Sequence, residues 1–251
     1  MCFDLDSLPP IAPIAGAAVS HQDLSLRAAD GTSFAAFEAM PESPGRVGIV
    51  ILPDIRGLYR FYEELALRFA ERGYMALAFD YFGRTAGAEK RDDTFDRKPH
   101  VEAVSPEEIQ LDVRAAVDHL RSLGVQTVFT VGFCVGGRHS WLAAAAGHGL
   151  AGAVGFYGRP GESADGKPGP AQLAAAIQAP ILALQAGADQ NITADDNEAF
   201  ERALADARVE HELVVYEGAP HSFFDRKQEE FASASEDAWA RVLDFIERHG
   251  R

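Results

Sequence analysis

The sequence is poor in cysteine, with only Cys2 and Cys134 among 251 residues. Two cysteines so far apart cannot form the disulfide framework of a small secreted protein, so we expect a reducing, cytoplasmic setting. Long apolar runs are also missing, and none approaches the roughly 18 residues that a membrane-spanning helix requires. The N-terminal stretch MCFDLDSLPPIAPIAG contains two aspartates and no basic residue, a composition that is not typical of a secretory signal.

Basic residues are scarce as well, with 23 lysines and arginines against 38 aspartates and glutamates and a formal net charge of −15. This charge argues against nucleic acid and anionic membranes as partners, because both attract a basic surface. A small anionic substrate needs only a local group of arginines, so we expect a small-molecule partner. No internal repeat or interface stripe is visible, and the pattern is compatible with a monomer or a homodimer.

Strand and helix patterns alternate from residue 46 to the end, which predicts a mostly parallel sheet with helices on both faces. An antiparallel hairpin over residues 20–42, with its turn at ADG, precedes this part. We expect a single α/β domain over residues 1–251, with residues 1–18 held loosely. The polar stretch 81–104 is typical of a lid or a binding loop. The expected strands cover 46–53, 74–80, 125–133, 150–158, 179–187 and 211–218, and the expected helices cover 60–73, 105–124, 136–149, 194–207 and 228–250, with a short alanine-rich helix before 179.

Cys134 lies where an expected strand meets an expected helix, in the sequence VGFCVGG. A sharp turn there holds the central side chain above the carboxyl edge of the sheet, and its neighbours Gly132 and Gly136 must be small for the turn to close. The Val135 N–H and the N-terminus of the helix then face the site, where they stabilise a thiolate or an oxyanion. The alternative is a buried structural cysteine at an ordinary strand–helix join.

A thiol nucleophile needs a base, and the base needs an acid that orients it. Asp189 and His221 each follow an expected strand by a few positions, on the same edge as Cys134. The order of nucleophile, acid and histidine is that of the α/β-hydrolase arrangement, so we predict a Cys134–His221–Asp189 triad. The remaining histidines are interpreted as surface or structural residues. The charged stretch 92–102 lacks regular ligand spacing, so we expect no metal and no cofactor.

Six stretches together resemble the dienelactone hydrolase (carboxymethylenebutenolidase) family, a branch of the α/β-hydrolases with a cysteine nucleophile. The resemblance covers residues 20–249 and implies an α/β-hydrolase fold. The turn with cysteine in place of serine is its most specific part, followed by the pattern around the histidine. The matching stretches are LPDIRGL (52–58), LAFDYFGR (77–84), VGFCVGGR (131–138), GFYGR (155–159), AGADQNI (186–192) and YEGAPHSFF (216–224).

The resemblance also implies roles for residues around the thiol. Asp54 matches an acidic residue that holds the resting thiol neutral, although the best-known members have the longer glutamate there; a plain turn residue is the alternative. The N–H of Ile55 would be the second oxyanion donor beside that of Val135.

Further roles concern the carboxylate of the substrate. Arg84 matches an arginine of the family that binds it, and the planar guanidinium fork suits two parallel hydrogen bonds. The other family arginine follows the histidine by four residues, where this sequence has Asp225 and then Arg226. Tyr157 and Arg159 are additional candidates for substrate binding.

These assignments predict an enzyme of aromatic-compound degradation. It would hydrolyse an activated ester, a carboxylate-bearing enol-lactone converted to a product of the maleylacetate type, through a thioester on Cys134. One alternative is a general small-molecule carboxylesterase or thioesterase. A second is a non-catalytic ligand-binding protein on the same scaffold.

Overall fold

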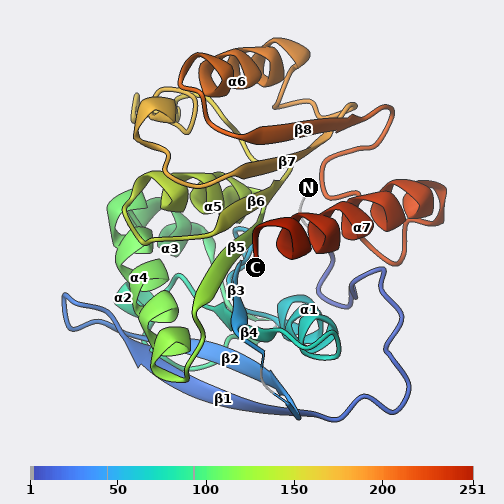
Figure 1. Cartoon of the computed structure of the whole chain (residues 1–251). Helices are drawn as coiled ribbons and strands as arrows, with labels where there is room; N and C mark the ends of the chain where they lie inside the picture. The colour runs from blue at the N-terminus through green and yellow to red at the C-terminus, as the bar shows by residue number, and fades with distance from the viewer. Residues whose placement is uncertain (1–2, 44, 93, 251) are drawn as a thin grey trace.

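An eight-stranded sheet forms the centre of the computed structural model, which describes residues 3–43, 45–92 and 94–250 (Figure 1). Cys2 lies outside the described residues. The strand order is β1-β2-β4-β3-β5-β6-β7-β8; β1 and β2 pair antiparallel, β2 pairs antiparallel with β4, and all other neighbours are parallel. The strands are β1 (Val19–Arg27), β2 (Ser33–Pro41), β3 (Val47–Leu52), β4 (Met75–Phe79), β5 (Thr127–Phe133), β6 (Gly152–Phe156), β7 (Ile181–Ala186) and β8 (His211–Tyr216).

Helices cover both faces of this sheet, as the alternating pattern predicts. The longer helices are α1 (Arg60–Ala70), α4 (Pro106–Ser122), α5 (Val135–Ala145), α6 (Ala194–Asp206) and α7 (Ala232–His249). Apolar side chains of α1 and α7, such as Phe61 and Val242, share one core with the sheet. Those of α4, α5 and α6, such as Val113 and Trp141, pack on the opposite face (Figure 1). The mostly parallel sheet with an N-terminal hairpin and two helical layers is confirmed.

Local sequence explains where these elements begin. Ser105 and Glu108 form a reciprocal capping box at the start of α4, and Thr193 and Asp196 form another at the start of α6. Strands β4 to β7 consist almost entirely of buried residues, because helices cover both of their faces.

Four segments differ from the expectations. The alanine-rich helix before β7 is only a 3₁₀ turn, Ala174–Ala176, and the closing helix begins at Ala232 after a 3₁₀ turn, Glu229–Phe231. The stretch 81–104 holds two short helices, α2 (Gly83–Ala86) and α3 (Lys98–Ala103).

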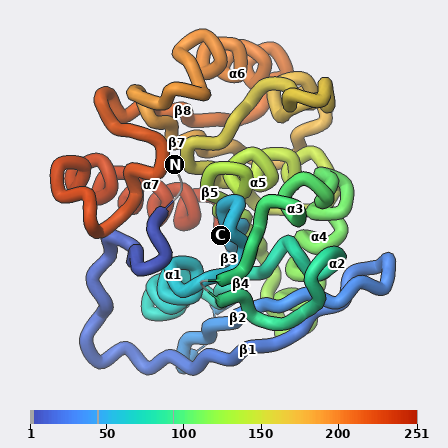
Figure 2. The backbone as a smooth tube through the Cα atoms, turned by 180° about the vertical axis from the view of Figure 1, so that it is seen from behind, coloured from blue at the N-terminus to red at the C-terminus, as the bar shows by residue number. Residues whose placement is uncertain are grey.

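The N-terminal segment is the fourth difference, since residues 3–11 do not have the loose character expected for residues 1–18. Within its described part, Phe3, Ser7 and Ile11 are buried. Figure 2 shows this end of the chain near the middle of the molecule, between α7 and β5. Among the described residues, no helix is both long and apolar enough to span a membrane.

The strand order fixes where a ligand site can form. From β3 the chain passes to β4 on one side, whereas β5 lies on the other side of β3. Loops that leave β3 and β5 therefore diverge and open a crevice at the carboxyl ends of these strands, the usual position of ligands in open α/β sheets. The loop after β3 begins at Pro53, and the residue after β5 is Cys134.

Candidate active site

Cys134 occupies a strained turn between β5 and α5. Its backbone has φ 56° and ψ −116°, a conformation that costs free energy for a residue with a side chain and that is concentrated at functional sites. A Cβ on Gly132 would lie 2.0 Å from the carbonyl oxygen of Gly136, and one on Gly136 would lie 2.1 Å from that of Leu52. Both glycines are therefore required by the close approach of the backbone, as the sequence predicts.

His221 and Asp189 form a close pair on the loops after β8 and β7. The Nδ1 atom of His221 lies 2.5 Å from Oδ2 of Asp189. Burial works against the charge of Asp189, but the hydrogen bonds from His221 and from the Asn191 N–H hold the pKa of this carboxyl below its usual range. The histidine ring also packs against Tyr157, with the ring centroids 4.9 Å apart.

A pocket of about 790 Å³ brings Cys134 and His221 together. Asp189 lies behind His221, on the side of a neighbouring hollow that His221 also lines. Ile55 and Val135 line the pocket too, and Val135 is the first residue of α5, so its N–H has no acceptor within the helix. The remaining lining residues are Phe3, Asp4, Leu5, Arg56, Arg97, Arg138, Tyr157, Arg159, Asn191 and Ile192.

Asp54 is buried beside this pocket, where its carboxylate is bound to a residue that the sequence analysis did not single out. Nη2 of Arg56 lies 2.7 Å from Oδ2 of Asp54, and the Arg56 side chain lines the pocket. The hydroxyl of Tyr62 accepts a hydrogen bond from the Asp54 N–H at 2.8 Å, which fixes the start of this loop. Only the position of Arg56, two residues after Asp54 in LPDIRGL, pointed to this ion pair.

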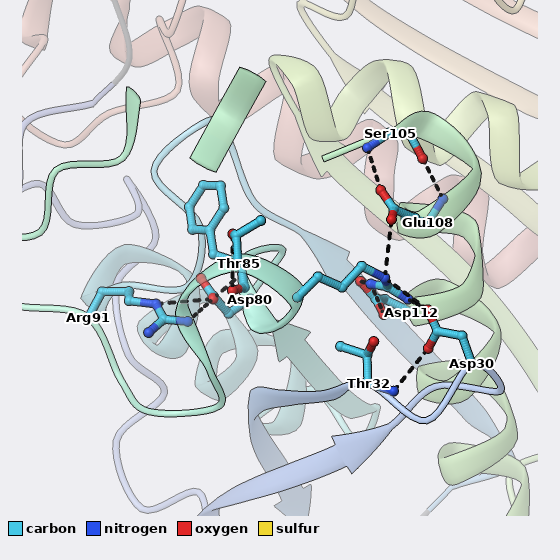
Figure 3. A network of polar contacts seen from close by, with 10 residues as sticks. Asp30, Thr32, Asp80, Thr85, Arg91, Ser105, Glu108 and Asp112 are labelled. Atoms are coloured by element: carbon cyan, nitrogen blue, oxygen red, sulfur yellow. Dashed lines mark hydrogen bonds and ion pairs between the residues drawn. The ribbon is translucent and has the colours of Figure 1, made fainter. Parts of the chain in front are cut away.

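The structure does not place Arg84 in the pocket, and the expectation that it binds substrate is corrected here. Its Nη1 lies 2.6 Å and 2.7 Å from the two oxygens of Asp112, and its Nη2 lies 2.9 Å from Asp30. Figure 3 shows the acidic groups of this network, Asp30, Glu108 and Asp112, on one side of α2. Arg84 therefore joins α2 to α4 and to the β1–β2 turn.

Arg226 is also outside the pocket. Its backbone N–H donates to the carbonyl oxygen of Leu8 at 3.1 Å, and its side chain lines a separate groove beside residues 10–13. Tyr157 and Arg159, the other candidates for substrate binding, line the pocket, and Nη2 of Arg159 donates to the carbonyl oxygen of Asn191 at 3.1 Å.

Sequence reasoning missed part of the pocket lining. Arg56, Arg97 and Arg138 were not predicted, although Arg138 stands in the quoted stretch VGFCVGGR. Arg138 donates to backbone carbonyls of Arg159, Gly161 and Pro168, so it organises the loop after β6. Phe3 and Leu5 could not be identified from the sequence. No local pattern in this proline-rich segment predicts contacts with residues that are distant along the chain.

Other titratable groups lie apart from the site. His119 pairs with Glu38 and His148 with Gln110, and Asp196 caps α6. Within residues 3–43, 45–92 and 94–250, no group of three histidine, cysteine or acidic side chains is arranged to hold a metal ion.

Comparisons with known proteins identify the family of this chain. The model of the dienelactone hydrolase family matches residues 34–250. The Rhodococcus opacus protein named "Carboxymethylenebutenolidase" is 30% identical over 99% of this chain and 97% of that protein. A "Putative carboxymethylenebutenolidase" from Escherichia coli (strain K12) is 30% identical over 96% of this chain and 94% of that protein. The crystal structure of a "Putative Dienelactone Hydrolase" from Klebsiella pneumoniae, 27% identical, superposes with a TM-score of 0.79 over 91% of this chain and 98% of that one.

Proposed function

Because the chain belongs to the dienelactone hydrolase family, we propose that it hydrolyses an enol-lactone that bears a carboxylate, through a thioester on Cys134. The observation that carries this proposal is the pocket itself. It holds a strained cysteine at a helix N-terminus, a histidine bound to a buried aspartate, and several arginines. This combination is the one expected of a nucleophile with its base and an anionic substrate.

Each residue then has a defined step. The Cys134 thiolate attacks the lactone carbonyl, and the N–H groups of Ile55 and Val135 stabilise the oxyanion; removing one such donor typically costs about 3–4 kcal/mol of transition-state stabilisation. Collapse of the tetrahedral adduct breaks the ring C–O bond, and the resulting enolate stays within the acyl group that is now bonded to sulfur. His221, oriented by Asp189, then takes a proton from water, which attacks the thioester and frees the acid.

The thiol restricts the substrate to esters with good leaving groups. A tetrahedral adduct on sulfur expels the thiolate again unless the other group leaves more easily. An enolate leaves easily, whereas an amide nitrogen or a simple alkoxide does not. Activated esters are therefore favoured over amides and alkyl esters.

Arginines in the pocket provide the anion site that Arg84 does not. The lining includes Arg56, Arg97, Arg138 and Arg159 against one carboxylate, Asp4, in a chain whose net charge is −15. Arg97 lines the pocket and is exposed, so its guanidinium can approach a substrate carboxylate.

A general esterase or thioesterase is a second candidate, because Arg84 lies elsewhere and apolar side chains such as Phe3, Leu5 and Ile192 form much of the lining. A comparison of cis- and trans-dienelactone with p-nitrophenyl acetate separates the two candidates. The enol-lactone proposal expects a much higher kcat/KM for one of the lactones and a rise of KM for that lactone in Arg97→Ala. Equal kcat/KM values for the lactones and the neutral ester would favour the general esterase.

The nucleophile is tested separately with Cys134→Ala. We expect no turnover, an unchanged melting temperature, and no acyl adduct in mass spectra of the denatured reaction. Retained activity in Cys134→Ala would reject the mechanism.

A further inference from the structure

The N-terminal segment, defined here as residues 3–11, forms one wall of the active-site pocket. We propose that Phe3 and Leu5 are specificity-determining residues, which limit the size of the ester that reaches Cys134. The proposal rests on the function proposed above. None of the stretches that predicted the site includes this segment, and its residues lie more than 100 positions from Cys134 along the chain.

Phe3 is part of an aromatic cluster that reaches the histidine. Its ring stacks on Phe61 with the centroids 4.1 Å apart, and it meets the rings of Phe133 and Tyr157 edge-on at 6.3 Å. Tyr157 in turn packs against His221. The Phe3 side chain is therefore separated from the histidine by a single ring, and its volume sets the width of the pocket on this side.

The segment is anchored to the loop that carries His221. Ser7 donates through Oγ to Oδ2 of Asp225 at 3.0 Å, and both side chains are buried. The Leu8 carbonyl accepts from the Arg226 N–H at 3.1 Å, and Lys227 forms an ion pair with Asp6. Because a buried hydrogen bond to a carboxylate is costly to leave unmade, this attachment holds the wall in place.

Leu5 stands at the mouth of the pocket. It is 45% exposed, an unusual position for a large apolar side chain, and it lines both the main pocket and a small neighbouring groove. Arg97 also lines both hollows, and Arg91 and Phe95 line the groove. The mouth is thus bounded by the N-terminal segment on one side and by Arg91, Phe95 and Arg97 on the other, so a bulky ester must pass Leu5.

The substitutions Phe3→Ala and Leu5→Ala test the wall with two neutral esters, p-nitrophenyl acetate and the larger p-nitrophenyl benzoate. We expect the ratio of kcat/KM for benzoate over acetate to rise about tenfold, as for a pocket enlarged by a few methylenes. Leu123→Ala is the matched control, since Leu123 is 44% exposed at the end of α4 and remote from the pocket lining. Its ratio should equal that of the wild type.

A second readout does not depend on turnover. Alkylation of Cys134 by iodoacetamide and by the bulkier N-phenylmaleimide is followed by mass spectrometry of the peptide that contains it. The rate with the maleimide, relative to iodoacetamide, should rise in Phe3→Ala and Leu5→Ala. Ser7→Ala keeps the side chains of Phe3 and Leu5 but removes the hydrogen bond to Asp225. Its alkylation ratio should rise in the same direction by a smaller amount. This variant replaces Phe3→Ala in the test if Phe3→Ala does not fold.

The outcomes separate the two proposals. If the wild type hydrolyses no ester but the ratio of maleimide to iodoacetamide alkylation still rises in the variants, the hydrolase proposal is wrong. The proposal that Phe3 and Leu5 limit access to Cys134 is then supported. If esters are hydrolysed but the benzoate-to-acetate ratio and the alkylation ratio in the variants equal those of the wild type, Phe3 and Leu5 do not limit the size of the substrate. A uniform loss of rate with both esters, together with a lower melting temperature, would mean that Phe3 only stabilises the fold and would also refute this proposal.

Discussion

Arg56 binds the carboxylate of Asp54 with two of its nitrogens, Nε at 3.2 Å from Oδ1 and Nη2 at 2.7 Å from Oδ2. Burial works against the charge of Arg56, but Asp54 more than compensates, so the pKa of the guanidinium lies above its ordinary value. The guanidinium also lies over the ring of Tyr59, 4.3 Å from its centroid. Because Arg56 lines the pocket, this pair fixes the position of one side chain of the lining.

Replacing one partner of this ion pair should lower the free energy of unfolding more than replacing both partners. Asp54→Asn leaves a buried cation without its counter-charge, so we expect the free energy of unfolding to fall by about 3–5 kcal/mol. The double variant Asp54→Asn with Arg56→Met should recover most of this loss, because neither charge is then buried. Urea unfolding of both single variants and the double variant measures the coupling. Additive losses would contradict a buried ion pair.

Arg84 should matter for stability and little for substrate binding. Arg84→Met leaves the fully buried Asp112 unpaired, so we expect a loss of about 3–5 kcal/mol in the free energy of unfolding. Below the melting temperature of the variant, KM for a carboxylate-bearing lactone should stay within about twofold of the wild-type value. A large rise of KM in Arg84→Met, comparable to that in Arg97→Ala, would show that Arg84 binds the substrate carboxylate.

Asp189→Asn should impair chemistry while leaving the fold intact. In the proposed mechanism the carboxylate would keep the proton of His221 on Nδ1 and leave Nε2 to accept one, whereas an amide at this position favours the other tautomer. We expect kcat to fall by about 10³–10⁴-fold, with a small change in melting temperature. Stopped-flow measurements on an activated ester provide the check. A loss below tenfold would assign the orienting role to another group.

The predictability of the site differs from residue to residue. Cys134, Asp189 and His221 could be placed at one edge of the sheet because each follows an apolar strand, and parallel strands end at a common edge. Arg84 also follows a strand, but the apolar pattern does not report where a long side chain points. Its direction is set by Asp112 on α4, a contact between distant segments.

The N-terminal segment illustrates the same limit for the backbone. Residues 3–11 have no strand or helix periodicity, so the sequence predicts a loose terminus. Their burial comes from Phe61, Phe133 and Asp225, which are distant in sequence. Contacts of this kind are properties of the assembled fold and leave no local pattern.

The turn at Cys134 gives a test with a close internal control. Gly132→Ala would push a methyl group into the Gly136 carbonyl, so we expect a loss of more than about 3 kcal/mol or failure to fold. Gly161→Ala places its methyl group in open space and should change the free energy of unfolding by less than about 0.5 kcal/mol. Thermal and urea unfolding compare the two. Equal effects would mean that the tight turn is not maintained in solution.

His139 should make the protein sensitive to mild acid. Burial, with a further contribution from Arg138, lowers the pKa of this imidazole to about 3. The unfolded chain therefore binds a proton near pH 6.5 that the folded chain does not, and stability falls as the pH decreases. Between pH 7 and pH 5 this group should cost about 2 kcal/mol. Urea unfolding of His139→Gln at both pH values should show a correspondingly weaker pH dependence; an unchanged slope would contradict the assignment.

The first and last described residues lie at opposite ends of the parallel strands. Phe3 lines the pocket, whereas Gly250 lies against Val47, where β3 begins. A purification tag or fusion partner ahead of Phe3 would start beside the substrate entrance and compete with the molecules being assayed. The same addition after α7 would extend from the far side, so kinetic constants for this enzyme are best compared on protein tagged there.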